Sequence, residues 1–128
     1  MQAIFDHSEQ EADDIITFWF KPEKTLRYTA GQFTELRLPH HNVDERGDKR
    51  WFTLSSSPTD QMVSITTKFP VRHTSSFKQQ LKSLQPGTIV NLAEPMGDFV
   101  LPQQTSIPLV FVAGGIGVTP MHSMIKWL

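Results

Sequence analysis

The sequence predicts a mainly β protein: a small antiparallel barrel with one short helix, followed by the opening of an α/β unit. Short runs of β-branched and aromatic residues, separated by turn residues, fill most of the first hundred positions. One segment changes to helical spacing, and a continuous apolar run near the C-terminus leads into a glycine-rich loop. Many short strands accompanied by a single helix favour a barrel.

Five segments of the first hundred residues read as barrel strands, namely residues 14–20, 31–39, 51–55, 62–67 and 88–94. The first two are closed by Pro22 and Pro39, which cannot continue a central strand. The stretch between residues 40 and 49 is polar and contains a glycine, so we expect a loop there.

The helix is predicted where the apolar spacing becomes four and then three, at Phe77, Leu81 and Leu84. Either Thr74 or Ser75 is suited to cap its start. Beyond it, residues 109–113 form a continuous apolar run, typical of a strand buried on both faces, and a glycine loop and a second helix follow. We therefore place a domain boundary near residue 104, which gives two parts, residues 1–104 and 105–128.

Composition excludes several classes of function. The net charge is −1 and the basic residues are scattered, so we expect no nucleic-acid partner. No cysteine is present, which excludes a cysteine-ligated iron–sulfur cluster in this chain, and no metal site is expected. The longest apolar run is interrupted by proline and glycine and is too short for membrane insertion. The acidic N-terminus is no signal peptide, so we expect a cytoplasmic location.

The first candidate motif is RWFTLSSSP, residues 50–58. Arg50 offers a rigid fork of donors that suits a phosphate. Phe52 offers a flat face for a ring system, and Thr53 offers a hydroxyl. Trp51 is counted with the cofactor-binding candidates, although such a tryptophan is more often a core or rim residue. By itself, the motif fits an ordinary strand with a serine-rich turn equally well.

The second candidate motif surrounds the predicted helix start and comprises Arg72, His73, Thr74, Ser75 and Ser76. A helix start carries unpaired backbone N–H groups and a positive dipole end, which suit a phosphate. Simple capping by Thr74 or Ser75 is the favoured interpretation when the motif is considered without its context.

The third candidate motif is GGIGVTP, residues 114–120. Its glycines, Gly114, Gly115 and Gly117, allow a backbone to approach a pyrophosphate closely. Thr119 suits a helix N-cap and Pro120 the first helical position. A lone glycine loop is a weak signal, but a strand before it and a helix after it are the context that such a loop requires.

Together the three motifs resemble those of the ferredoxin–NADP reductase superfamily, in its order and spacing, over almost the whole chain. The resemblance implies a six-stranded antiparallel Greek-key β-barrel followed by the first strand and helix of a truncated Rossmann-like α/β domain. It implies that Arg50 contacts the cofactor pyrophosphate, that Phe52, where the family usually has tyrosine, packs against the flavin, and that Thr53 acts catalytically near flavin N5. Residues 72–76 then form a second phosphate segment, and residues 114–120 form the nicotinamide segment.

The function implied by the resemblance is that of an FAD-dependent NAD(P)H oxidoreductase, with FMN as the alternative flavin and NAD(P)H as substrate. Such a protein passes electrons to an acceptor, for example an iron–sulfur domain or protein. We expect this 128-residue chain to be an incomplete form that is inactive alone, and to self-associate through the exposed strand 109–113. Two alternatives stay open: a non-catalytic flavin-binding or interaction module, and a barrel without a ligand.

Overall fold

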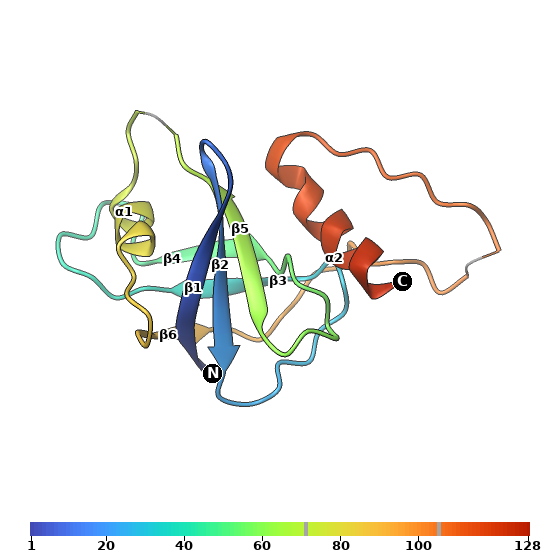
Figure 1. Ribbon diagram of the computed structural model, residues 1–128, viewed down its shortest axis with the longest axis horizontal. Helices are drawn as coiled ribbons and strands as arrows, with labels where there is room; N and C mark the ends of the chain where they lie inside the picture. The colour runs from blue at the N-terminus through green and yellow to red at the C-terminus, as the bar shows by residue number, and fades with distance from the viewer. Residues whose placement is uncertain (71, 105) are drawn as a thin grey trace.

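The computed structural model describes residues 1–70, 72–104 and 106–128. Its elements are β1 (Gln2–Ala12), β2 (Ile15–Pro22), β3 (Phe33–Arg37), β4 (Lys49–Thr53), β5 (Val63–Lys68), α1 (Ser76–Lys82), β6 (Ile89–Leu92), the 3₁₀ turn η1 (Gly115–Val118) and α2 (Thr119–Trp127). The strands form one sheet in the order β4-β3-β6-β1-β2-β5, and every pairing between them is antiparallel (Figure 1). The predicted mainly β fold with six antiparallel strands is confirmed.

The sheet curls until its two edge strands meet. Just beyond β4, the backbone N–H of Ser55 donates to the carbonyl of Ser64 in β5 at 2.8 Å. The last strand, β6, returns between β1 and β3, which is the crossing expected of a Greek key. Closure matters for the site, because it brings β4 and β5 side by side at one end of the barrel.

The core is formed by the inward-facing side chains of the strands and by α1, which covers one end of the barrel. Phe18, Phe20, Leu36, Leu54 and Ile65 are buried inside the sheet. Phe77 and Leu81 of α1 are fully buried against the same core, as their helical spacing predicts. Burial of each large side chain contributes about 1.5–3 kcal/mol.

The longest strand, β1, was not among the strands predicted from the sequence. Its first half alternates and points Ala3 and Phe5 into the core, but its second half is exposed on both faces. That half pairs through its backbone with β2 and carries no apolar alternation. Strands are recognised in a sequence by the alternation of apolar and polar residues. A hairpin arm that is exposed to solvent on both faces lacks this alternation and cannot be recognised in this way.

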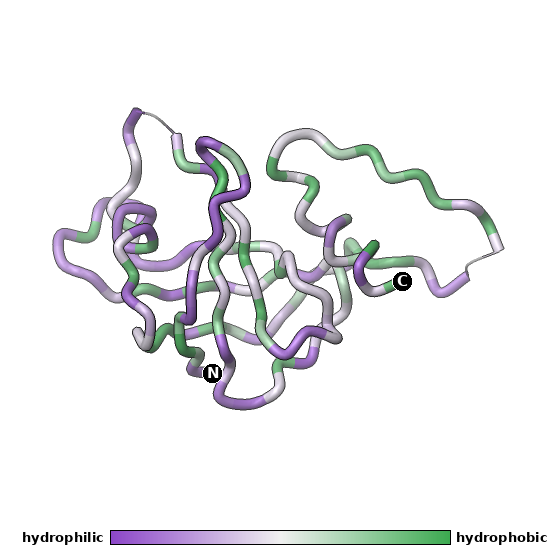
Figure 2. The backbone as a smooth tube through the Cα atoms, in the orientation of Figure 1, coloured by the Kyte–Doolittle hydropathy of each residue, from purple (hydrophilic) through white to green (hydrophobic). Residues whose placement is uncertain are grey.

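The predicted strand 109–113 does not form among the described residues. The segment runs outside the barrel as an extended loop (Figures 1 and 2). Val110 and Val112 are 85% and 84% exposed. A buried parallel strand needs neighbours on both sides, and no described strand lies beside this one.

The second helix forms as predicted but begins one residue earlier than expected. Val118 is the N-cap of α2, so Thr119 opens the helix instead of capping it, and Pro120 stands at its second position. The Thr119 hydroxyl donates to the carbonyl of Ile116 at 3.1 Å. Both α-helices are short, and none in the described ranges has the length and apolarity to cross a membrane.

Gly31 occupies the most constrained glycine position. Its φ is +102°, and an added Cβ would stand 2.1 Å from the carbonyl oxygen of Phe99. Gly87 has a similar φ of +92° but open space around it. We expect Gly87→Ala to cost about 1–2 kcal/mol of unfolding free energy from backbone strain, and Gly31→Ala a further 1–3 kcal/mol, roughly, from the clash. Urea unfolding of both variants measures the difference, and equal losses would contradict the clash.

Candidate functional site: a groove between the barrel and the second helix

Arg50 lies at the start of β4 with its guanidinium held by the preceding loop. Its Nη1 donates to the carbonyls of Arg46 at 2.6 Å, Gly47 at 3.1 Å and Lys49 at 2.6 Å. The guanidinium carbon lies 5.1 Å from the ring centroid of Phe77. Among the described residues, Nη2 is shielded from solvent and has no hydrogen-bond partner. One nitrogen of the fork therefore keeps its capacity to bind an acceptor.

Three cations gather around one cavity of about 410 Å³. Arg46, Arg50 and Lys78 all line it, together with Ser75. Burial lowers the pKa of Lys78, and the charges of Arg46 and Arg50 lower it further, because like charges disfavour another positive charge. A cluster of this kind, with a buried unsatisfied guanidinium nitrogen, suits an anion such as a phosphate.

The start of α1 is satisfied by the chain's own side chains. The Ser75 hydroxyl accepts from the backbone N–H of Lys78 at 3.3 Å, and the Asp44 carboxylate accepts from that of Ser76 at 2.8 Å. The Ser76 hydroxyl in turn accepts from the backbone N–H of Asp44 at 3.0 Å. The predicted capping by Ser75 is thus confirmed, whereas the N–H of Ser76 is not free for a phosphate.

The aromatic side chains continue the groove. Trp51, Phe52 and Thr53 line the 410 Å³ cavity and also a neighbouring open hollow of about 500 Å³, which Phe33 and Met96 complete. The Phe52 ring lies 5.9 Å from that of Phe77, and Trp51 meets Phe33 edge-on at 5.5 Å. The groove therefore runs from a cationic end to an aromatic end, which suits a flat ring that carries a phosphorylated tail.

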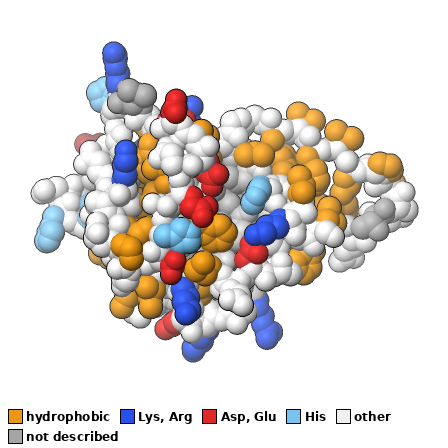
Figure 3. Space-filling model, viewed as in Figure 1, with side chains coloured by type: hydrophobic (Ala, Val, Ile, Leu, Met, Phe, Trp, Pro, Cys, Tyr) orange, Lys and Arg blue, Asp and Glu red, His pale blue; other side chains and the backbone are white. Residues whose placement is uncertain are grey.

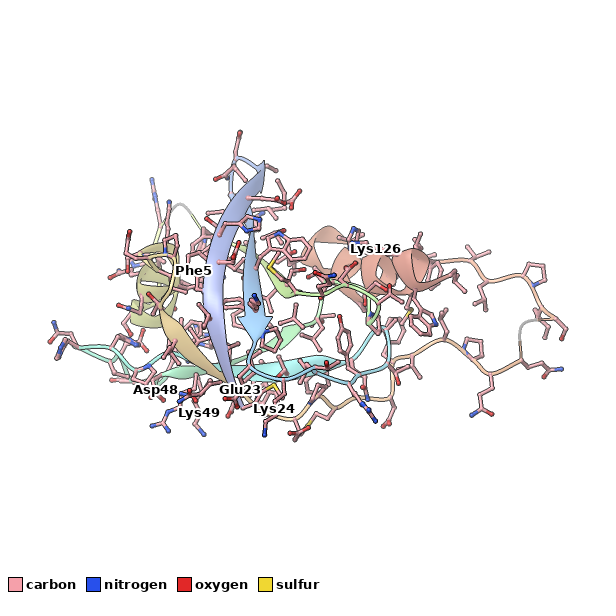
Figure 4. All side chains as sticks on the ribbon, turned by 60° about the horizontal axis from the view of Figure 1, so that its bottom comes forward. Phe5, Glu23, Lys24, Asp48, Lys49 and Lys126 are labelled. Atoms are coloured by element: carbon pink, nitrogen blue, oxygen red, sulfur yellow. The ribbon has the colours of Figure 1, made fainter. Side chains whose placement is uncertain are left out.

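The opposite wall of the cavity is held in place by α2. The Ser123 hydroxyl donates to the carbonyl of Ser56 at 2.5 Å, and His122 Nδ1 donates to that of Ser55 at 2.8 Å. Lys126, which Figure 4 labels on α2, forms an ion pair with Asp60 at 2.8 Å. These contacts dock the helix on the connection between β4 and β5.

Ser56 is the centre of this junction on the barrel side. Tyr28 Oη lies 2.9 Å from the Ser56 hydroxyl, and burial raises the pKa of Tyr28 to about 12. The Ser56 hydroxyl also accepts from the backbone N–H of Ser64 at 2.9 Å. The neutral tyrosine therefore stays a hydrogen-bonding partner at physiological pH, and the connection on which α2 docks is held against the barrel.

The structure brings together part of the predicted site. The predicted site residues among those that line the 410 Å³ cavity are Arg50, Trp51, Phe52, Thr53, Ser75, Gly117, Thr119 and Pro120. The two motifs that were expected to converge on one nucleotide, around Arg50 and Ser75, therefore share a wall, and the third motif faces them.

Other predicted residues lie elsewhere. Arg72, His73 and Gly114 are exposed and line neither the groove nor the two cavities beside the β1–β2 hairpin. Of these two cavities, Thr74 lines one of about 640 Å³, and Gly115 lines one of about 480 Å³ between that hairpin and α2. Ser76 is engaged with the loop before β4 through its contacts with Asp44.

Sequence reasoning missed two of the three cations, Arg46 and Lys78. Lys78 directly follows the buried Phe77 in the first turn of α1, and this position beside the predicted phosphate segment could have suggested a role for it. Arg46 lies in an irregular polar loop, for which neither spacing nor period gives a signal.

Sequence comparisons identify relatives of this chain. The chain is 32% identical over 144 residues to flavohemoprotein A of Dictyostelium discoideum, covering 98% of this chain and 34% of that protein. It is 35% identical over 126 residues to an NADPH oxidoreductase of Mycobacterium tuberculosis, covering 93% and 32%. The chain thus spans about a third of the length of these curated relatives. No protein-family model matches it.

Solved structures share the fold. The flavohem-like FAD/NAD-binding domain of nitric oxide dioxygenase from Vibrio cholerae superposes with a TM-score of 0.80 at 21% identity, covering 98% of this chain and 55% of that one. Phthalate dioxygenase reductase superposes with a TM-score of 0.81 at 22% identity, covering 98% and 38%. At these identities the likeness establishes the fold, and function has to be argued from the groove.

Proposed function

We propose that this chain is the FAD-binding part of an NAD(P)H-dependent oxidoreductase. Its relatives and its fold confirm the resemblance to the ferredoxin–NADP reductase superfamily. The observation that carries the proposal is the groove itself. Its cationic end holds a buried guanidinium nitrogen without a hydrogen-bond partner among the described residues, and its aromatic end offers flat faces. The residues present therefore fit a flavin dinucleotide.

In this proposal each part of the groove has one role. Arg46, Arg50 and Lys78 hold the diphosphate, because they are the cations that line the cavity. Trp51 and Phe52 pack against the flavin ring and exclude water from it. Thr53, at the end of β4, lines both cavities and would present its hydroxyl to the flavin ring as the catalytic group. Bound FAD supplies the redox chemistry, accepting hydride and giving up electrons.

The C-terminal residues form the approach for the second substrate. Gly117, Thr119 and Pro120 face the groove from the wall that α2 holds. We assign residues 1–104 to the flavin-binding domain and residues 105–128 to the start of the NAD(P)-binding domain. Hydride transfer from NAD(P)H then requires the whole protein, because this chain spans only about a third of the length of its relatives.

The proposal for the electron acceptor is based on two structural neighbours. Phthalate dioxygenase reductase is a modular structure for electron transfer from pyridine nucleotides to a 2Fe-2S centre, and a flavohemoglobin of Malassezia yamatoensis contains bound FAD and heme. We propose that electrons from the flavin of this protein likewise go to an iron–sulfur or heme centre. We also propose that the protein works in the cytoplasm.

Titration of the purified chain with FAD tests the proposal. We expect saturable one-to-one binding, with quenched flavin fluorescence and a shifted visible band as the ring enters the aromatic end of the groove. NAD(P)H is expected to reduce the bound flavin efficiently only when the residues that follow in the relatives are supplied. A chain that leaves the flavin spectrum and fluorescence unchanged at any concentration would refute flavin binding.

A further inference from the structure

We propose that Asp44 selects FAD over FMN, by keeping a fixed negative charge beside the phosphate end of the groove. This inference rests on the proposed function, because it requires that the groove binds a flavin. It concerns a residue of the polar loop between β3 and β4, to which the sequence motifs assign no role.

Asp44 is held rigidly in place. Its Oδ2 accepts from the backbone N–H of Ser76 at 2.8 Å, and its Oδ1 accepts from that of Arg46 at 3.0 Å. Its own backbone N–H donates to the Ser76 hydroxyl, which also lies 3.0 Å from His40 Nε2. The carboxylate is therefore tied both to its own loop and to the first residue of α1.

The position of the carboxylate relative to Arg50 gives it a role in recognition. Asp44 Oδ1 lies 3.7 Å from Arg50 Nη2, the nitrogen that keeps its capacity for an acceptor. A phosphate oxygen bound to Nη2 at about 2.9 Å would lie within about 7 Å of the carboxylate. The backbone N–H of Ser76 lowers the pKa of Asp44, so the carboxylate stays charged at neutral pH.

The two flavins differ in the charge that they place on one phosphate. A phosphate monoester, as in FMN, has a second pKa near 6 and carries about −1.5 to −2 at pH 7. Each phosphate of FAD has one ester bond, one anhydride bond and one negative charge, and Arg46 and Lys78 line the same cavity as cations for the second phosphate. The additional charge of FMN would face Asp44, which we expect to disfavour it about tenfold, equivalent to about 1.4 kcal/mol.

A purely structural role for Asp44 gives a different result. If the carboxylate only ties the loop to α1, its removal should change the affinities for FAD, FMN and unphosphorylated riboflavin by the same factor. A charge that acts on the phosphate changes the ratio of the FMN and FAD affinities and leaves riboflavin unaffected.

The experiment compares the three flavins on the wild-type chain and on Asp44→Asn, which keeps an amide oxygen as an acceptor. Dissociation constants are measured by fluorescence titration at pH 7.5. We expect the preference for FAD over FMN to fall about tenfold, with the riboflavin constant unchanged. The matched control is Asp48→Asn, because Asp48, which Figure 4 labels, lies in the same loop but pairs with Arg37 at 2.9 Å. It should leave all three constants unchanged.

An unchanged ratio of FMN to FAD affinity in Asp44→Asn, or an equal change in Asp48→Asn, would overturn the inference while leaving flavin binding intact. If Asp44→Asn unfolds, Asp44→Ser, which keeps a side-chain oxygen that can cap a helix, repeats the comparison. A wild-type chain that binds none of the three flavins refutes the proposed function, and the selection by Asp44 with it.

Discussion

Arg50→Ala is expected to weaken the binding of FAD at least about 100-fold. The Arg50 side chain is 14% exposed, its Nη1 donates to three backbone carbonyls of residues 46–49, and its Nη2 remains for an acceptor. Charge-assisted hydrogen bonds contribute about 1.5–3 kcal/mol each, and about 2.7 kcal/mol corresponds to a factor of 100. Fluorescence titration of the variant measures the loss directly.

Two further variants make this result specific. Arg72→Ala removes the other arginine that the motifs assign to phosphate, but this side chain is exposed and lines no wall of the groove. We expect less than a threefold effect from it. Arg50→Lys keeps the charge and loses the fork, so it should recover only part of the affinity. A larger loss from Arg72→Ala than from Arg50→Ala would move the phosphate anchor to the second motif.

The contrast between these two arginines shows how far the sequence could predict the site. Arg50 is in a strand, so its distance from Phe52 and Thr53 is fixed by the extended backbone and the motif defines a surface. Arg72 lies in the connection between β5 and α1, where spacing along the chain does not determine where a side chain points. The first motif pointed to Arg50, and Arg50 lines the groove. The second motif pointed to Arg72, but Arg72 is exposed to solvent.

The loop between β3 and β4 could not be predicted for a related reason. Asp44 and Arg46 come near Arg50 only because the loop folds back and binds the start of α1, 32 residues later in the sequence. Such tertiary contacts leave no period and no turn signature in the sequence. In contrast, Phe77 and Leu81 of α1 were predicted as core, because helical spacing reports directly which face is buried.

The apolar segment 109–113 shows the opposite case, in which the sequence predicted a structural element that does not form. Its pattern reports the environment for which a strand is suited, but the strand needs partners before its backbone can pair. Here the segment lies outside the barrel, and hydrophobic side chains gather on that side of the molecule (Figure 3). The pattern therefore reports the preference of the segment, and the local structure predicted from it was wrong.

The same segment leads to the second large effect, which is a change of assembly state. We expect the 128-residue chain to self-associate through residues 109–113, because Val110 and Val112 are almost fully exposed and the segment is a strand-forming sequence without a described strand beside it. Light scattering at tens of micromolar should show a mass of at least twice 14.6 kDa. The double substitution Val110→Lys/Val112→Lys should return the chain to a monomer.

A matched control separates this segment from general surface hydrophobicity. Val43 and Ile89 are also exposed, at 45% and 58%, but lie outside the segment, so Val43→Lys/Ile89→Lys should leave the association unchanged. Backbone pairing also predicts that Val110→Pro, which removes one N–H donor and keeps the site apolar, weakens association nearly as strongly as the lysines. If the proline variant associates like the wild type, the contact is made by side chains alone, and a strictly monomeric wild-type chain would refute association altogether.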